Sequence, residues 1–522
     1  MSFVSAAEYE NPFLDVSVQA KFMAPSGRII QREAYWDGGK DYKVSFAPTE
    51  VGIWNWKLTA PEETGLNVES GTVECVTYQG DIPIYKHGFL KVSSDGRYLM
   101  HDDGTAFFWL GDTHWEFAYK EKWSESSHKE MDSMFKGMAD RRAKQGYNVY
   151  QTNLRSDAVM GGDVLYWDKN SETDLPNVEF YQNELDRRME YLADLGFVNA
   201  LGQAWFVSMD GTAKSLAHQK NLARYIIARY GALPICWTLA GEVAGYTPGE
   251  SRQMLIENWR KVALYIEGLD GYNNLQTAHY TNERPFADYY QEEEWFDFTL
   301  NQAGHGDFPI SVGQYQEHRR KFPNKPFVEG EALYEYCSTL EELGSRLCTA
   351  DMLRRVAYIS IQTGGCGYTY GAQGIWDCVL EKGTKNPLGA VFNRFDITWD
   401  EAIDGIGGAQ MGMMKQFYED CHFEELHPYI EEDEEAAGNP FGKKLPLISK
   451  TEDGKRFVFY YADTARSSCE ISGMNNAVYH MQWFDPRTGT YIPVNEKCVP
   501  VNGKWKTPAK LEAGDWLLVV EQ

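Results

Sequence analysis

The sequence has little positive charge. Its 522 residues include 50 Lys and Arg against 76 Asp and Glu, which gives a formal net charge of −26. Because nucleic-acid binding needs a basic surface, this balance argues against nucleic acid, an anionic membrane surface or a polyanionic substrate as the partner. The chain also lacks an apolar run that approaches the ~20 residues of a membrane-spanning helix.

Targeting segments and cysteine frameworks are missing as well. The first residues, MSFVSAAEYENPF, contain no basic stretch followed by an apolar one, as a secretory signal peptide would. The nine cysteines are scattered and show no CxxC spacing, which predicts neither a disulfide framework nor a zinc cluster. We therefore expect a soluble, cytoplasmic protein that uses no metal and no other cofactor.

The order of strand-like and helix-like patterns divides the chain into three parts. Residues 1–85 contain short alternating runs broken by Pro and Gly, which is typical of a small β-sandwich. Residues 86–428 begin with a hairpin that has Asp-Gly at its turn, and then alternate apolar runs with amphipathic segments that end in Gly. Residues 429–522 return to strand patterns after the acidic stretch EEDEEAAGNP, which we expect to be a solvated linker.

The middle part predicts a (β/α)8 barrel. Eight short apolar runs alternate with helical segments over roughly 260 residues, and such a barrel typically needs about 250. A doubly wound open sheet is the alternative, but its first strand should lead into a Gly-rich phosphate loop. The stretch GGAQMGMMKQ follows the eighth run and lacks the GxGxxG spacing. The expected fold is therefore α/β, a TIM barrel flanked by two small β-sandwich domains.

Polar and aromatic side chains follow the predicted barrel strands, and these strand ends form the catalytic face of a TIM barrel. A sugar needs many polar partners and flat apolar faces, so this mixture suits a polyhydroxylated substrate. For any one residue, satisfying a loop backbone explains its presence equally well, but agreement over eight strand ends favours the sugar for the set. The residues that we assign to substrate binding are Asp112, His114, Trp115, Asn153, Trp205, His279, Gln302, His305, Glu329, Tyr334, Tyr370 and Trp376.

Two carboxylate residues stand at the ends of predicted apolar strands. Glycoside hydrolysis needs two carboxyl groups on either side of one bond. Glu242 follows the fourth predicted strand and Glu331 the seventh, where burial could tune their pKa values. Glu329 comes two residues before Glu331, so on a regular strand it would face the same side and could support the catalyst or be the catalyst itself.

Several stretches resemble a known family. GRYLMHDDGTAFFWLGDTHWEF, RRAKQGYNVYQ, PICWTLAGE, LNQAGHG, KPFVEGEALYE and GYTYGAQGIW resemble, in this order, the DUF4038 apiosidase-like glycoside hydrolases. Near the N-terminus, WDGG and VSFAPTEVGIWNW resemble the DUF5060 β-sandwich. In the C-terminal part, WFDPRTGTY and DWLLVVE are similar to the small β-domain labelled "putative collagen-binding".

The resemblance implies a retaining TIM barrel whose acid/base follows the fourth strand and whose nucleophile follows the seventh. These roles fall on Glu242 and Glu331, respectively. Many relatives carry Asp at the position of Glu242, so the best-known specificity of the family does not carry over directly. We expect an exo-acting glycosidase that cleaves plant- or microbe-derived oligosaccharides or glycosides. The sugar, its linkage and a homo-oligomeric state are left open.

Two other functions are compatible with parts of the pattern. A metal-dependent amidohydrolase is also a barrel with His at its strand ends, here His114, His279 and His305. Such enzymes typically carry His-x-His on the first strand. This chain has Asp-Thr-His-Trp-Glu there and no HExxH motif. A catalytically inactive carbohydrate-binding protein would be favoured by the loss of either carboxylate, and both are present.

Overall fold

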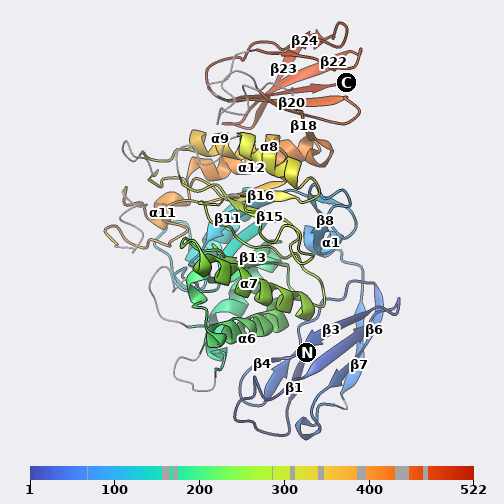
Figure 1. Cartoon of the computed structure of the whole chain (residues 1–522), viewed down its shortest axis with the longest axis vertical. Helices are drawn as coiled ribbons and strands as arrows, with labels where there is room; N and C mark the ends of the chain where they lie inside the picture. Colours follow the sequence, from blue (N-terminus) through green and yellow to red (C-terminus); the bar gives the residue numbers. More distant parts are fainter. Residues whose placement is uncertain are drawn as a thin grey trace.

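The computed structural model shows three parts arranged along the long axis of the molecule (Figure 1). An N-terminal sandwich and a C-terminal β-domain lie at opposite ends of a central barrel. The acidic stretch that we interpreted as a linker, residues 431–440, lies outside the described residues. The structure describes the whole chain except residues 68, 156–164, 168–173, 285, 306–311, 339–345, 385–394, 430–445 and 463–467.

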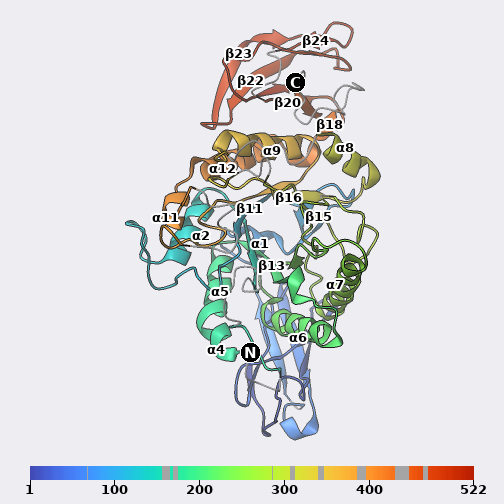
Figure 2. The ribbon, with the colours of Figure 1, turned by 60° about the vertical axis from the view of Figure 1, so that its left-hand side comes forward.

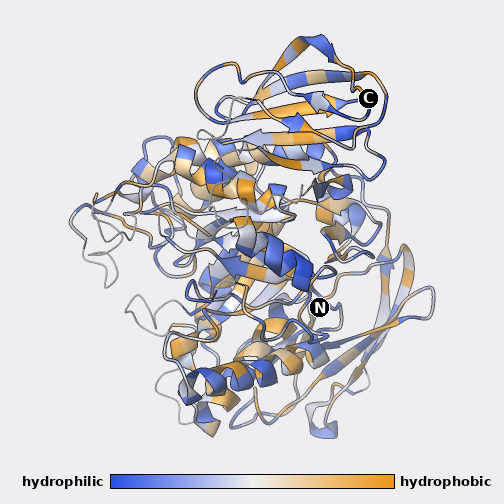
Figure 3. Cartoon of the chain, turned by 45° about the horizontal axis from the view of Figure 1, so that its top comes forward, coloured by the Kyte–Doolittle hydropathy of each residue, from blue (hydrophilic) through white to orange (hydrophobic). Residues whose placement is uncertain are grey.

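Two small antiparallel sheets form the N-terminal sandwich. One contains, in order, β1 (Ser2–Val4), β5 (Asp41–Lys43) and β4 (Tyr35–Trp36). The other contains β3 (Ile29–Glu33), β2 (Gln19–Met23), β6 (Gly52–Thr59) and β7 (Ser70–Cys75), and the 3-10 turn η1 (Glu62–Thr64) joins its last two strands. Alternation along β2 buries Ala20 and Phe22 in one core with Trp54, as strand periodicity requires. Along the terminal sheets, hydrophobic and hydrophilic residues alternate visibly (Figure 3).

The predicted hairpin at the start of the middle part is confirmed. After α1 (Pro83–His87), the strands β8 (Leu90–Val92), β9 (Leu99–His101) and β10 (Ala106–Phe107) pair in an antiparallel sheet. Gly96 lies in the Asp-Gly turn with φ of 70°. A Cβ atom there would stand 2.2 Å from the backbone oxygen of Asn324, so the turn requires glycine for space as well as for conformation.

The central sheet is the predicted TIM barrel. Its parallel strands are, in spatial order, β14 (Ile235–Gly241), β13 (Val198–Trp205), β12 (Val149–Asn153), β11 (Trp109–His114), β17 (Gly367–Tyr370), β16 (Phe327–Glu331) and β15 (Thr299–Gln302). The predicted fifth strand is not a regular strand. It closes the barrel through two isolated bridges, from Gln276 to Trp237 of β14 and from His279 to Leu300 of β15.

Helices cover the outside of the barrel, so its strands are buried on both faces, which is why they read as apolar runs. The regular helices are α2 (Met134–Lys144), α4 (Val178–Phe180), α5 (Asp186–Asp194), α6 (Ala213–Tyr230), α7 (Glu250–Leu269), α8 (Val312–Lys321), α9 (Ala350–Gln362), α11 (Trp399–Ala402) and α12 (Ile406–Asp420). Single turns are η2 (Tyr181–Leu185), η3 (Phe206–Ser208) and η4 (Phe423–Glu425). In the described part of the chain, no helix is long and apolar enough to cross a membrane.

The C-terminal β-domain begins with β18 (His427–Tyr429). Its large sheet continues through β19 (Leu447–Lys450), β20 (Arg456–Tyr461), β25 (Trp516–Glu521), β22 (Tyr479–Asp485) and β23 (Thr490–Cys498). A small sheet pairs β21 (Glu470–Ile471) with β24 (Trp505–Lys506). The large sheet lies on α9 and α12, as two views show (Figures 1 and 2). Tyr358 of α9 stacks on Tyr460, with ring centroids 5.0 Å apart, and Phe417 of α12 meets Phe484 at 4.5 Å.

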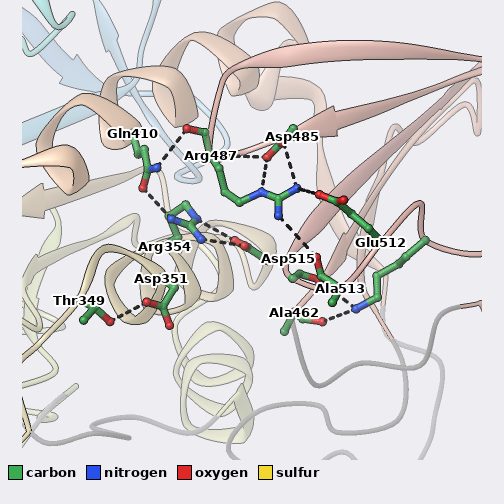
Figure 4. Close-up of polar contacts among 12 residues, drawn as sticks. Thr349, Asp351, Arg354, Gln410, Ala462, Asp485, Arg487, Glu512, Ala513 and Asp515 are labelled. Carbon is green, nitrogen blue, oxygen red and sulfur yellow. Dashed lines mark hydrogen bonds and ion pairs between the residues drawn. The ribbon is translucent and has the colours of Figure 1, made fainter.

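A buried polar network fixes this contact (Figure 4). Arg354 of α9 donates to both carboxylate oxygens of Asp515, at 3.0 and 2.9 Å, and to the side-chain oxygen of Gln410 at 2.6 Å. Gln410 donates in turn to the backbone oxygen of Arg487 at 3.1 Å. Arg354 and Asp515 are only 5% and 6% exposed, so each charge depends on the other for compensation.

Removing Asp515 should therefore destabilise the chain. Asp515→Ala leaves Arg354 buried without its counterion, and we expect a loss of about 3–5 kcal/mol in the free energy of unfolding, measured by urea denaturation. Glu512→Ala is the matched control, because Glu512 pairs with Arg487 at the exposed rim of the same contact and should contribute less than about 1 kcal/mol. Equal losses in the two variants would contradict the assignment.

Candidate active site

Strand alternation decides which side chains reach the barrel interior. On β12, the Gln151 side chain donates across the barrel to the backbone oxygen of Gly330 at 2.9 Å, whereas the Tyr150 hydroxyl donates outward to Glu121 at 3.1 Å. Side chains two residues apart share a face, so Asn153 lies on the interior side with Gln151. The same alternation on β11 turns Thr113 and Trp115 inward.

Glu331, at the end of β16, is held by two imidazoles. The Nε2 atom of His279 lies 3.0 Å from Oε2, and Nε2 of His305 lies 3.1 Å from Oε1. Burial raises the pKa of the Glu331 carboxyl, but the two imidazoles outweigh burial and hold this pKa well below its ordinary value. These contacts favour the ionised form of Glu331, with a hydrogen bond at Oε1 and an ion-pair contact at Oε2.

The orientation of His279 follows from its second contact. Its Nδ1 atom accepts a hydrogen bond from the backbone N–H of Glu242, at 3.4 Å. A nitrogen that accepts carries no proton, so in the neutral ring the proton belongs on Nε2, which faces Glu331. One imidazole thus contacts the backbone of one candidate carboxylate residue and the side chain of the other.

Glu242 follows β14 in a left-handed backbone conformation, with φ of 56°. Its Oε1 atom accepts hydrogen bonds from the Tyr246 hydroxyl and from the Gln302 amide, the latter at 3.3 Å. Burial and the negative charge of Glu331 raise the pKa of Glu242, and the Tyr246 hydroxyl opposes that shift only in part. The pKa values of the two carboxyl groups are thus pushed in opposite directions, which is the pattern of an acid and a nucleophile.

Glu329 and Glu331 do not face the same side, so that expectation was wrong. Asn301 pairs with Glu329 and Gln302 with Glu331, which makes Gly330 the extra residue of a β-bulge. Glu329 accepts hydrogen bonds from Asn301 at 2.6 Å and from Tyr315 of the outer helix α8 at 2.8 Å. Burial raises the pKa of Glu329 to about 8. Its contacts place it in the wall of the barrel.

Aromatic rings surround the two imidazoles. Trp115 meets Trp205 edge-on, with ring centroids 5.3 Å apart, and meets His279 at 5.7 Å. Tyr334 lies 4.6 Å from His305 and 5.9 Å from Trp376. The three tryptophans and Tyr334 form, with Cys337, an apolar cluster separate from the main barrel core.

Two glycines make room for these rings. A Cβ atom on Gly241 would stand 2.4 Å from the Trp205 ring, and one on Gly371 would stand 2.1 Å from the Tyr334 ring. Neither distance is compatible with a side chain, so the ring positions depend on glycine at these two strand ends.

Several buried polar atoms on the interior side lack a partner. Within the described residues, these include both amide atoms of Asn153, Trp205 Nε1, Gln302 Oε1 and Thr113 Oγ1. Thr113 lies near the Tyr334 hydroxyl without reaching hydrogen-bond geometry. Buried polar groups in proteins are almost always hydrogen-bonded, so a group of orphans near one pair of carboxylates calls for a ligand. The orphans include donors and acceptors, as sugar hydroxyls require.

Asp112 and His114 lie elsewhere than expected. Both are fully buried; Asp112 accepts from Arg142 of α2 at 2.5 Å, and His114 Nε2 lies 3.0 Å from the same carboxylate oxygen. His114 Nδ1 lies 2.7 Å from Glu121. Asp112 and His114 alternate with Thr113 and Trp115 along β11, so their side chains point to the opposite face, toward the helix layer. Their placement does not support the expected role in sugar binding.

Tyr370 belongs to the same wall network. Its hydroxyl donates to Glu335 at 2.6 Å, and the Arg142 guanidinium lies 4.9 Å from the centre of its ring. Tyr370 therefore shares Arg142 with Asp112, on the helix side of β17. The structure does not bring it to the paired carboxylates.

The remaining expected residues gather on the interior side, and sequence reasoning missed two that belong with them. Thr113 was detectable from its alternation with Trp115, whereas no sequence signal pointed to Tyr246. His114 lies apart from His279 and His305, and the described residues contain no group of three or more His, Cys, Asp or Glu placed to hold a metal ion. The residues brought together are Trp115, Asn153, Trp205, Glu242, His279, Gln302, His305, Glu331, Tyr334 and Trp376.

A TIM barrel with two carboxyl groups of opposed pKa shift at its strand ends is the arrangement that glycoside hydrolases use. The profile of the family described as "Apiosidase-like, catalytic domain" matches residues 93–425, and the chain belongs to this family. Residues 1–61 match the domain of unknown function DUF5060. Residues 437–521 match the family described as "Putative collagen-binding domain of a collagenase".

Several solved structures share this fold. A protein described as "Glycoside hydrolase" aligns with a TM-score of 0.68 and 22% identity, covering 85% of this chain and 99% of its own. A family 5 glycoside hydrolase from Bacteroides vulgatus aligns with a TM-score of 0.67 and 20% identity, covering 86% of this chain and 96% of its own. A "putative glycoside hydrolase" from the same organism aligns with a TM-score of 0.74 and 15% identity, covering 100% of this chain and 98% of its own. A comparison with curated proteins found no match.

The two faces of β11 should respond differently to mutation. Asp112→Ala leaves Arg142 fully buried without its carboxylate, and we expect a loss of about 3–5 kcal/mol in the free energy of unfolding. Thr113→Val, on the next residue, removes an unpaired hydroxyl and should leave stability nearly unchanged while lowering kcat/KM. Thermal unfolding and steady-state kinetics of both variants check this. A stable Asp112→Ala enzyme with impaired kinetics would instead support a role of Asp112 in substrate binding.

Proposed function

We propose that the protein is a retaining, exo-acting glycosidase in which Glu331 is the nucleophile and Glu242 the acid/base. The observation that carries the proposal is the contrast between the two carboxyl groups. Two imidazoles keep Glu331 ionised, whereas burial and the charge of Glu331 favour the protonated form of Glu242. An ionised nucleophile next to a protonated acid is the starting state of a retaining glycosidase.

In the first step, a Glu331 oxygen attacks the anomeric carbon and the glycosidic bond breaks. Glu242 gives its proton to the leaving oxygen, so the aglycone departs as a neutral alcohol. In the second step, Glu242, now a carboxylate, takes a proton from water, and the water oxygen displaces Glu331 from the sugar. Both substitutions invert the anomeric carbon, and the product keeps the original configuration.

Retention requires the two carboxyl groups to be close. They stand about 5–5.5 Å apart in retaining enzymes and ~6.5–9.5 Å in inverting ones, where a water must fit between them. A single ring, His279, contacts both the Glu242 backbone and the Glu331 carboxylate, and the charge of Glu331 affects the pKa of Glu242. Both facts support the shorter separation.

The hydrogen bonds on Glu242 assign its two oxygens different roles. Tyr246 and Gln302 both donate to Oε1. We propose that Oε2 therefore carries the catalytic proton and faces the leaving group. Tyr246 acts as a positioning residue, because its hydroxyl fixes the rotation of the carboxyl group and stabilises the ionised form.

The substrate proposal rests on the rings and orphan atoms of the interior. Three indoles and a phenol offer flat faces to the apolar side of a sugar, while the orphan amide and hydroxyl groups suit its hydroxyls. We propose terminal sugars of plant- or microbe-derived glycosides and short oligosaccharides as substrates.

Substitution of the carboxyl groups separates their roles. Glu331→Gln should abolish turnover of every aryl glycoside, because no covalent intermediate forms. Glu242→Ala should keep the first step with activated leaving groups, because these need no proton. Added azide should then replace water in the second step and give a glycosyl azide of retained configuration. Burst kinetics and NMR of the anomeric product check this. An inverted product, or an active Glu331→Gln enzyme, would refute the assignment.

The pH profile tests the pKa pattern. The active form needs Glu331 ionised and Glu242 protonated, so kcat/KM should fall on the alkaline side at the raised pKa of Glu242. The Tyr246 hydrogen bond favours the ionised form of Glu242 and lowers its pKa. Tyr246→Phe should therefore shift the alkaline limb to higher pH and leave the acidic limb in place. A shift to lower pH, or none, would argue against the contact.

A further inference from the structure

An arginine without a partner lies at the end of the barrel opposite to the catalytic carboxylates. Arg319 is in the last part of α8, near the N-terminal ends of β16 and β17. It is half-buried, and within the described residues its guanidinium makes no hydrogen bond and no ion pair. Burial and the nearby charge of Arg97 lower the pKa of Arg319, and the charge of Asp95 offsets this shift only in part.

Arg319 lines a cavity between the barrel and the C-terminal β-domain. Two buried hydroxyls line the same cavity, Tyr418 of α12 and Ser449 of β19, and neither has a hydrogen-bond partner in the described part of the chain. The Tyr418 hydroxyl lies near Gln362 without reaching hydrogen-bond geometry. Two buried hydroxyls without a partner and one half-exposed guanidinium, from α12, the C-terminal sheet and α8, thus line one cavity. Buried hydroxyls rarely stay unpaired without a ligand.

The charge around the cavity is positive. Arg97 also lines it and is fixed by Asp95 at 2.6 Å and by the backbone oxygen of Glu424 at 2.6 Å. Asp95 is therefore engaged by Arg97 and makes no ion pair with Arg319. Besides burial, the charges of both arginines lower the pKa of His427, so their field extends over the site. Glu452, whose carboxylate lies 3.5 Å from His427 Nε2, opposes this shift.

We propose that this cavity binds a small tetrahedral oxyanion, phosphate or sulfate. The Arg319 guanidinium supplies a planar fork that matches two oxygens, and the Tyr418 and Ser449 hydroxyls donate to the others. The cavity leaves about 20 Å³ to the centres of water-sized atoms, against the ~10–15 Å³ that one water needs. This space suits a compact ion.

The ion would connect three elements that no direct hydrogen bond joins at this point. Ser449 belongs to the C-terminal sheet, whereas Arg319 and Tyr418 belong to helices of the barrel. Binding to the folded chain alone raises its stability by mass action. The cavity lies at the N-terminal ends of β16 and β17, whereas the carboxylate pair lies at the C-terminal strand ends, so the ion would contact no reacting group. The proposal is therefore independent of the proposed function.

A purely structural role for Arg319 makes a different prediction. Its guanidinium crosses Gly364 at the C-terminal end of α9, where a Cβ atom would stand 2.5 Å from Nη1. A cation in that position stabilises the helix end through the helix dipole, with or without an ion. In that case phosphate should have no specific effect, and loss of the charge should lower stability under all conditions.

Thermal unfolding at constant ionic strength, with sodium chloride replaced by phosphate or sulfate, tests the proposal. The full chain should show a saturable rise in Tm of about 2–5 °C at a hundredfold excess over Kd. Isothermal titration with inorganic phosphate should give one site per chain. Acetate should not reproduce the shift, because a planar carboxylate leaves the hydroxyls unsatisfied. An equal shift with acetate or chloride would overturn the oxyanion assignment.

Variants locate the site. Arg319→Gln should weaken phosphate binding about tenfold or more and remove the Tm shift, and without phosphate it should be at least as stable as the parent. Arg320→Gln, the neighbouring exposed arginine of α8, is the matched control and should keep the full response. Ser449→Ala and Tyr418→Phe should each weaken phosphate binding several-fold. They replace Arg319→Gln as the test of the site if that variant does not fold. A full phosphate response in Arg319→Gln would overturn the proposal, whatever the hydrolytic activity.

Discussion

Burial of the barrel strands on both faces is the constraint from which the active site follows. A side chain at a strand end has two choices, the interior or the helix layer, and successive residues alternate between them. On β11 this places Thr113 and Trp115 in the interior, and it commits Asp112 and His114 to ion pairs with the wall. The side chains of this stretch are thus divided between the barrel interior and the wall.

Local departures from that alternation create the carboxylate pair. The bulge at Gly330 sends Glu329 outward and Glu331 inward, although two residues separate them. The predicted fifth strand makes only isolated bridges, and His279 on it reaches the backbone of Glu242 as well as the Glu331 carboxylate. Irregular backbone therefore sets the two environments that push the pKa values apart.

The sequence was sufficient for the architecture but not for the side on which each residue lies. Apolar runs and Gly-terminated helices are local signals, and they predicted the barrel, its flanking domains and the strand ends that carry Glu242 and Glu331. Whether Glu329 shares a face with Glu331 depends on one extra residue relative to β15, which is a property of two strands together. Tyr246 was missed for a similar reason, because its link to Glu242 depends on the backbone turn after β14.

The C-terminal β-domain completes the barrel and is more than an attached module. Residues Val356–Gln362 of α9 are all buried, a pattern of a helix with no solvent-facing side. A helix in the outer layer of a barrel is normally exposed on one face, so α9 needs a second cover, which the large C-terminal sheet provides through Tyr460. Since α9 links β16, which ends in Glu331, to β17, the attachment of this sheet supports the strands on which the active site is built.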